Sequence, residues 1–422
     1  MKSRLMRMLP LVLLPLAACD LDVENPNALT EEEVLADQAG VIALAVGMQD
    51  LYAGEFDELI QAPALVTDEL GTTTGSLLSY RALFTGPAAD ILDDYGVVEE
   101  PFENTYLVLR TASTILDRVD DVGFDAATEA SISALARLYM GMALGSAVLH
   151  YGEAVLDLDA ENPPLEPRAV VMDSVLALLE AARLDFPGAG ASTIYMNRVV
   201  PSSFHTEDVI NAMLARYNLF DGNYAEAITA ADRVDLNRMS FFTYPSPDIN
   251  PIFNLGIYVQ PLASYVTDAE AGDGRLAYWV DVSATPTTGN PDSLLLPFGR
   301  YNDPDASIPV YLPDEMKLIK AEAYTRLMDY PEAADLINEV RTQTTSALDE
   351  PVAALPALPA TALDSEAELL AQIAYERHYE LYLQGLRWED VRRLGSVITV
   401  VPIIDYLPIP RQECVTNESI DC

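Results

Sequence analysis

Apolar residues recur with a helical period over much of the N-terminal half of the chain. Thr30 followed by Glu33 is a capping-box pattern, which predicts a helix from Thr30 to about residue 51. Three further helices are expected over residues 102–119, 126–151 and 168–184. The helix at 126–151 is rich in Ala, Leu and Met on every side, so we expect it to be buried all round.

Two later segments, 214–234 and 319–340, resemble helix–turn–helix pairs of the tetratricopeptide type. A small residue on the first helix of each, Ala215 and Ala321, would let the second helix approach closely. The two segments lie too far apart for a tandem array with a period of ~34 residues, and generic helical hairpins are the alternative. Under either interpretation the fold class is mostly α.

The pattern changes between these two pairs. Residues 239–311 are rich in Pro, Thr, Asn, Asp and Tyr and have little helical periodicity. Short extended runs at 256–260 and 294–297 are expected to form small β-hairpins. A loop this long inside a compact domain is usually functional. Because no clean boundary follows, we predict one domain over residues 31–422, made of helical hairpins with long irregular loops.

The first thirty residues predict export and lipidation. Three basic residues precede an apolar run at 9–16 that is too short to span a bilayer. Leu16-Ala17-Ala18-Cys19 then resembles a bacterial lipobox, whose cysteine is lipidated after cleavage. We therefore expect a signal peptide at 1–18, a lipid on Cys19 and an extended tether at 19–30. An ordinary signal peptide with a chance cysteine is the alternative.

Charge and cysteine content narrow the function classes. The formal net charge is -42, which disfavours nucleic acid because phosphate binding needs clustered Lys and Arg. The remaining cysteines, Cys414 and Cys422, are expected to pair in an exported protein and close a small loop at the C-terminus. Two thiols without a neighbouring histidine do not predict a metal site.

The chemistry of an enzyme is missing from the sequence. The chain has three histidines, none spaced for a shared metal, and no nucleophile elbow, phosphate-binding loop or dinucleotide-binding fingerprint. Asp303, Asp305 and Ser307 have the spacing of a calcium loop, but Ile308 stands where the sharp turn needs glycine. We predict no cofactor, no metal and no catalysis. The many carboxylates leave a surface glycoside hydrolase as the least favoured alternative.

The C-terminal region carries a long composite motif, E-R-x-x-E-L-x-x-x-G-x-R-W-x-D-x-x-R-x-G. With the lipobox and the helical hairpins, it resembles the SusD/RagB-like nutrient-binding outer-membrane lipoproteins. The Asp273-Gly274-Arg275-Leu276 turn and the closing segment 406–410 also resemble segments of this family. The residues that match the motif are Glu376, Arg377, Glu380, Leu381, Gly385, Arg387, Trp388, Asp390, Arg393 and Gly395.

The resemblance implies a lipid-anchored protein of the outer membrane that faces the cell exterior. Such a protein captures oligosaccharides or other small nutrients and sits as a lid on a SusC-like TonB-dependent transporter. It performs no chemistry, which agrees with the missing catalytic motifs. A lipoprotein scaffold that binds protein partners through its helical hairpins is the alternative from another class.

Two loops are expected to contact the ligand, which the sequence does not identify as a glycan, a peptide or another nutrient. Sugars are held by aromatic faces and planar polar side chains. Both tryptophans, Trp279 and Trp388, are expected to be structural, so tyrosines would supply the platform. Ordinary solvated loops are the alternative for each position. The candidate residues are Thr72, Thr73, Thr74, Tyr80 and Arg81 in the first loop, and Arg300, Tyr301, Asn302 and Asp303 in the second.

The motif itself is interpreted as an internal clamp that holds the last helices against the hairpins. Glu376 and Glu380 lie one helical turn apart and repel, so each is expected to need its own cation. Gly385 weakens a helix, which is tolerated where the chain bends or the backbone approaches closely. Beyond it, Trp388 and Arg392 are four residues apart and are expected to stack.

Overall fold

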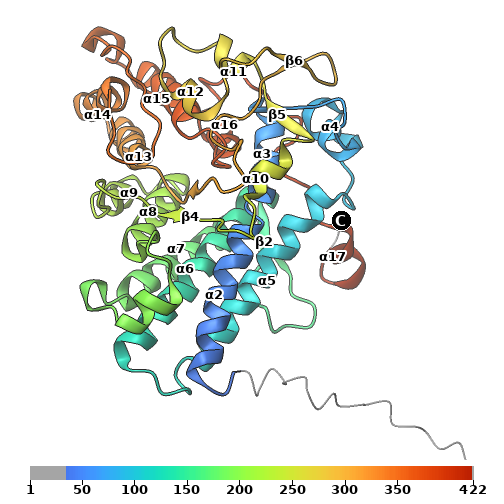
Figure 1. The fold of residues 1–422 in the computed structure, drawn as a ribbon, viewed down its shortest axis with the longest axis vertical. Helices are drawn as coiled ribbons and strands as arrows, with labels where there is room; N and C mark the ends of the chain where they lie inside the picture. Colours follow the sequence, from blue (N-terminus) through green and yellow to red (C-terminus); the bar gives the residue numbers. More distant parts are fainter. Residues whose placement is uncertain (1–34, 421–422) are drawn as a thin grey trace, which may run out of the picture.

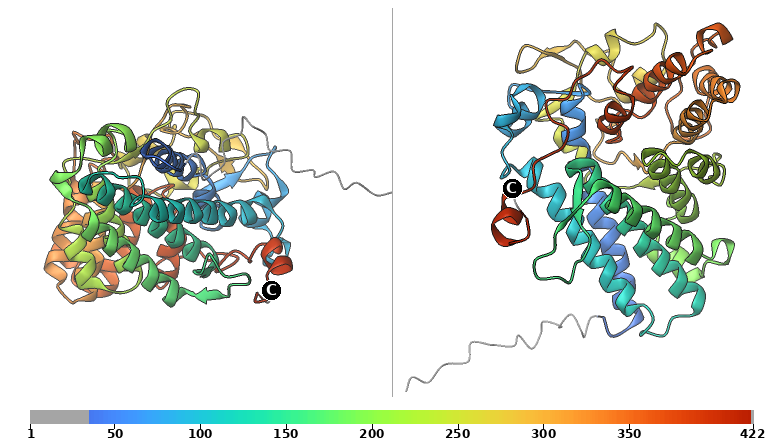
Figure 2. Two further views of the ribbon diagram at one scale, coloured as in Figure 1. Left: turned by 90° about the horizontal axis from the view of Figure 1, so that it is seen from below. Right: turned by 180° about the vertical axis from the view of Figure 1, so that it is seen from behind.

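Long helices that lie side by side form the N-terminal half of the structure, a computed structural model that describes residues 35–420 (Figures 1 and 2). Helix α2 packs on α5, and each later helix packs on the next. These helices are α2 (Gln38–Gly54), α5 (Gly96–Arg118), α6 (Ala126–Tyr151), α7 (Arg168–Asp185), α8 (Thr206–Phe220) and α9 (Tyr224–Ala231). The prediction of a mostly α fold is confirmed.

Helix α6 is the central core helix. The Asp125 side chain accepts hydrogen bonds from the backbone N–H groups of Ala127 and Thr128, and Gly152 ends the helix with φ +76°. It is the one described helix long and apolar enough to cross a membrane, but 83% of that apolar window is buried inside the protein. A Cβ on Gly145 would lie 2.1 Å from Tyr217, so glycine is needed for the close approach of α8.

The first predicted helix begins later than its sequence pattern indicated. Thr30 and Glu33 lie outside the described residues, and residues 35–37 form a turn. The Asp37 side chain instead accepts a hydrogen bond from the Gly40 N–H and caps α2. The expectation of a continuous helix from 30 to 51 is therefore wrong over 35–37.

The second helical pair stacks directly on the first. Helix α13 (Pro313–Arg326) contacts α9 as well as α14 (Tyr330–Thr342) and α15 (Glu366–Glu380), and α16 (Arg387–Leu394) follows. Ala215 and Ala321, the predicted contact alanines, are fully buried. The two pairs are thus distant in sequence but adjacent in space (Figure 1).

The irregular region between the pairs forms a separate layer over the end of the helices. Its first and last strands pair with each other, so the layer leaves and rejoins the helical array at one place. Four two-stranded antiparallel sheets occur among the described residues: β1 (Leu70–Thr72) with β5 (Val259–Pro261), β2 (Glu153–Val155) with β3 (Leu165–Pro167), β4 (Phe241–Phe242) with β8 (Ile308–Pro309), and β6 (Thr287–Thr288) with β7 (Leu294–Leu295).

Short helices complete the structure. The C-terminal segment returns along the end of α6, where the Leu407 N–H donates to the His150 carbonyl, and Arg411 of α17 pairs with Asp93 and Asp94 (Figure 2). The remaining elements are α3 (Glu58–Val66), α4 (Leu78–Thr85), η1 (Ala88–Asp90), η2 (Gly188–Gly190), η3 (Tyr195–Val199), α10 (Pro251–Leu255), α11 (Ser264–Thr267), α12 (Arg275–Trp279), η4 (Ala360–Ala362) and α17 (Arg411–Thr416).

Candidate ligand-binding site

An open polar hollow of about 710 Å³ lies in the irregular layer. Its walls are the end of α12 with residues 280–283 on one side and residues 298–307 on the other, with Asp349 at the edge. Three residues expected to contact ligand, Arg300, Asn302 and Asp303, line it together. The volume lies within the range of ~300–1,000 Å³ that is typical of small-ligand sites.

The planar guanidinium group of Arg300 is held in the wall of the hollow by its neighbours. Its guanidinium carbon lies 5.0 Å from the centroid of the Tyr278 ring. It donates to the Ser307 carbonyl at 2.8 Å and pairs with Asp349 at 2.6 Å. Burial raises the pKa of Tyr278, so its hydroxyl stays protonated and donates to the Asp349 carbonyl. Tyr278 was not among the predicted ligand contacts, although it follows the Asp273–Leu276 turn that the sequence analysis singled out.

Tyr301 lies beneath the hollow and not in its wall. Its side chain is fully buried, and its ring centroid is 6.0 Å from that of Trp279. The expectation that Tyr301 presents a face to ligand is therefore wrong. The turn at 299–303 points Tyr301 into the core, whereas Asn302 and Asp303 on the same turn are exposed.

The threonine loop lies apart from the hollow. Thr72 is buried and its hydroxyl donates to the Asn290 carbonyl, so the structure assigns it a contact within the fold and contradicts its expected ligand contact. The Thr73 hydroxyl donates to the Ile257 carbonyl, and Thr74 is exposed. Arg81 donates to the carbonyl of Ser76 in its own loop.

Tyr80 completes this second group. Its ring centroid lies 6.0 Å from that of Tyr258, next to β5. Leu77 and Leu78, which precede it, are strongly exposed. None of the threonine-loop candidates lines the hollow, so the structure separates the predicted contacts into two groups. The threonine loop offers a surface, whereas the residues around Arg300 offer a concave site.

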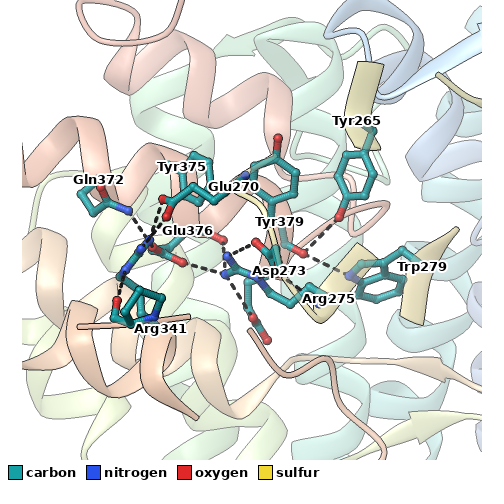
Figure 3. A network of polar contacts seen from close by, with 12 residues as sticks. Tyr265, Glu270, Asp273, Arg275, Trp279, Arg341, Gln372, Tyr375, Glu376 and Tyr379 are labelled. Atoms are coloured by element: carbon teal, nitrogen blue, oxygen red, sulfur yellow. Dashed lines mark hydrogen bonds and ion pairs between the residues drawn. The ribbon is translucent and has the colours of Figure 1, made fainter. Parts of the chain in front are cut away.

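Part of the C-terminal motif belongs to a buried ionic network (Figure 3). Glu376 on α15 pairs with Arg275 of the irregular layer at 2.7 Å and with Arg341 of α14 at 2.6 Å. Arg275 also pairs with Asp273, and all four of these side chains are completely shielded from solvent. One carboxylate therefore joins the irregular layer to the second helical pair.

A second network connects α15, α16 and α13. Asp390 accepts from Arg377 at 2.8 Å and from Arg393 at 2.7 Å, and Arg393 also pairs with Glu322. These contacts agree with the interpretation of the motif as an internal clamp. Arg387 donates to the Ala374 carbonyl at 3.2 Å.

The turn around Gly385 shows why the motif needs a glycine. Gly385 has φ +71°, and a Cβ there would lie 2.8 Å from the Leu59 carbonyl oxygen. Both predicted reasons, a bend and a close backbone approach, therefore apply. The predicted stacking also occurs, with the Arg392 guanidinium carbon 4.4 Å from the Trp388 ring centroid.

We expected each glutamate of the motif to have its own cation, and this expectation is wrong for Glu380. Its closest cation is Arg275, at 3.6 Å, which is already bound by Asp273 and Glu376. Burial raises the pKa of Glu380 well above its usual range. This direction favours the neutral form of Glu380, which would lessen its repulsion of Glu376.

The cysteines are only partly described. Cys414 is disulfide-bonded. Cys422, its predicted partner, and Cys19, the predicted lipidation site, lie outside the described residues. Pairing of Cys414 with Cys422 and lipidation of Cys19 stay predictions.

Comparison with known proteins points to one family. A family model described as the SusD family matches residues 314–407, the segment that contains α13 to α16 and both ionic networks. No curated protein sequence matches the chain.

Solved structures match over nearly the whole chain. One is NanU of Bacteroides fragilis, with 13% identity and a TM-score of 0.70 over 94% of this chain and 98% of that one. A SusD superfamily protein from the same organism matches with 16% identity and a TM-score of 0.70 over 92% and 100%. A SusD-like carbohydrate binding protein from Bacteroides vulgatus matches with 16% identity and a TM-score of 0.69 over 85% and 83%. At these identities the likeness shows a shared fold.

Proposed function

We propose that the chain is a SusD/RagB-like protein, since a SusD family model matches residues 314–407, and that it is a non-catalytic lipoprotein of the cell surface that captures oligosaccharides. The observation that carries the proposal is the open hollow around Arg300, which combines a fixed guanidinium, an aromatic ring beneath it and exposed polar side chains. A matched relative is itself named as carbohydrate binding.

The chemistry of the hollow fits a neutral, hydroxyl-rich ligand. Arg300 supplies donors, and Asn302 supplies both a donor and an acceptor. The carboxylates of Asp281 and Asp303 accept from hydroxyl groups. Hydrogen bonds from Ser283 lower the pKa of Asp281, so this carboxyl is poorly suited to act as the general acid of a glycoside hydrolase. We therefore assign these side chains the role of binding a sugar and assign Asp281 no role as an acid catalyst.

Substitution in the hollow should weaken oligosaccharide binding. We expect Asn302→Ala to reduce affinity roughly 2- to 13-fold, because it removes a hydrogen bond worth about 0.5–1.5 kcal/mol. The exposed side chain of Asn302 makes no hydrogen bond to the described residues, so the melting temperature should not change. Titration calorimetry with an oligosaccharide panel measures the affinity.

Thr74→Ala is the matched control, since Thr74 is also exposed but lies in the other loop. If Thr74→Ala weakens binding and Asn302→Ala does not, the hollow is not the site. If no oligosaccharide binds and reducing sugar is released, the proposal of a non-catalytic binder fails.

We further propose that the protein is anchored through Cys19 in the outer membrane, facing the cell exterior, and delivers its ligand to a TonB-dependent transporter. The tagged chain should recover a TonB-dependent barrel when it is purified from detergent-solubilised outer membranes. Cys19→Ala should release the protein from the membrane fraction without changing oligosaccharide affinity. Recovery of the intact, anchored protein without any barrel would contradict delivery to a transporter.

A further inference from the structure

A second cavity, of about 320 Å³, opens between α2 and the chain from β4 to Asp248. Residues 197–201, at the end of η3, form another of its walls. It shares no lining residue with the hollow around Arg300. Its volume is at the lower end of the ~300–1,000 Å³ range of ligand sites, so it suits one small, ring-sized molecule.

Gln49 on α2 lines this cavity with an unused acceptor. The residue is only 7% exposed, and its Nε2 donates to the carbonyls of Ala45 at 2.9 Å and Val199 at 2.8 Å. Those two bonds fix the orientation of the amide. The Oε1 atom receives no hydrogen bond from residues 35–420. An unsatisfied buried acceptor costs about 1–3 kcal/mol, and a donor on a bound molecule would remove that cost.

Two carboxylates in the same cavity lack a positive partner. Asp50 on α2 and Asp248 in the loop after β4 both line it, and neither forms an ion pair within the described part of the chain. Burial, and then the charge of Asp248, raises the pKa of Asp50. Arg198 also lines the cavity but is not among the groups that act on Asp50. Both side chains are exposed, and a cation beside them would relieve their mutual repulsion.

Aromatic rings supply the apolar part of the cavity. Tyr139, Phe204 and Phe242 are buried in its wall, and Phe241 is half-buried. The Tyr139 and Phe204 rings are stacked with their centroids 6.2 Å apart. Such a wall binds the carbon face of a sugar ring, and it also attracts a cation.

We propose that this cavity binds a protonated amino sugar, with its ammonium group between Asp50 and Asp248, a donor on Gln49 Oε1 and its ring against the aromatic wall. The inference rests on the proposed function and names a substrate class for a second subsite. The carboxylate pair selects the charged amine, whereas the rings and Gln49 accept the sugar body.

Three sugars that differ at one position test the proposal by titration calorimetry of the full chain. Glucosamine carries the ammonium group, N-acetylglucosamine replaces it with a neutral amide, and glucose replaces it with a hydroxyl. We expect glucosamine to bind at least tenfold more tightly than either neutral sugar, in a buffer that keeps its amine protonated. Equal affinities for the three sugars, or no binding of glucosamine, would overturn the proposal.

Substitutions identify the binding cavity. Asp248→Asn removes the charge but keeps the shape, and Asp248 is exposed, so the fold should be retained. We expect it to abolish the tenfold preference for glucosamine, whereas Asp120→Asn, at an exposed carboxylate that lines neither cavity, should leave the preference unchanged. A preference that survives Asp248→Asn and Asp50→Asn contradicts the assignment. Oligosaccharide binding that depends on Asn302 is measured separately, so failure of this subsite leaves the proposed function intact.

Discussion

Replacing Glu376 by Gln is expected to lower the free energy of unfolding by about 3–5 kcal/mol, because it removes the shared carboxylate from two buried arginines. Arg275 and Arg341 would keep their positive charges, and both side chains are completely buried. Of the two, Arg275 would retain Asp273 and Arg341 would retain Glu270 (Figure 3). Denaturant unfolding followed by circular dichroism measures the loss.

Glu366→Gln is the matched control. Glu366 also pairs with an arginine from another helix, Arg326, but its side chain is 52% exposed. An exposed pair of this kind contributes about 0–1 kcal/mol. The folded fraction of Glu376→Gln should bind oligosaccharide with unchanged affinity. A variant that unfolds normally but no longer binds would show that the motif acts on ligand and not on the fold.

Tyr301→Ala is expected to lower the free energy of unfolding by about 3–5 kcal/mol, because it leaves a ring-sized cavity beneath the hollow. The side chain is fully buried beside Trp279. Thermal and denaturant unfolding measure the effect. Tyr301→Phe keeps the ring and removes a buried hydroxyl that forms no hydrogen bond with the described residues, so the free energy of unfolding should stay close to that of the natural protein. A stable Tyr301→Ala protein with weakened binding would restore the original interpretation of Tyr301 as a ligand contact.

The sequence pattern did not predict which of the candidate residues are buried and which are exposed. Arg300, Tyr301, Asn302 and Asp303 form one polar stretch, and nothing in their order separates the buried ring from its exposed neighbours. That separation depends on the turn at 299–303 and on Trp279, which comes from a different segment. The threonine loop has the same ambiguity, since Thr74 is exposed whereas Thr72 is buried, paired with Val259 of β5 and bonded to the Asn290 carbonyl, both from distant segments.

The residues that line the second cavity could not be predicted from the sequence. Gln49, Asp50 and Asp248 have no motif spacing, and a chain with 66 acidic residues offers many such pairs by chance. Only the approach of α2 to the loop after β4 brings the two carboxylates to one cavity. The buried, unsatisfied oxygen of Gln49 is likewise a property of packing.

Local patterns along the chain were enough to predict the mostly α fold, the two helical pairs and the family resemblance. These depend on local periodicity, on small residues at helix contacts and on a composite motif whose members lie close together in the chain. The folded chain was needed to show that the two pairs stack, that Glu376 joins two distant arginines and that Glu380 has no cation of its own. Each of these depends on contacts between segments far apart in the sequence, where burial and charge are set by the neighbours that folding supplies.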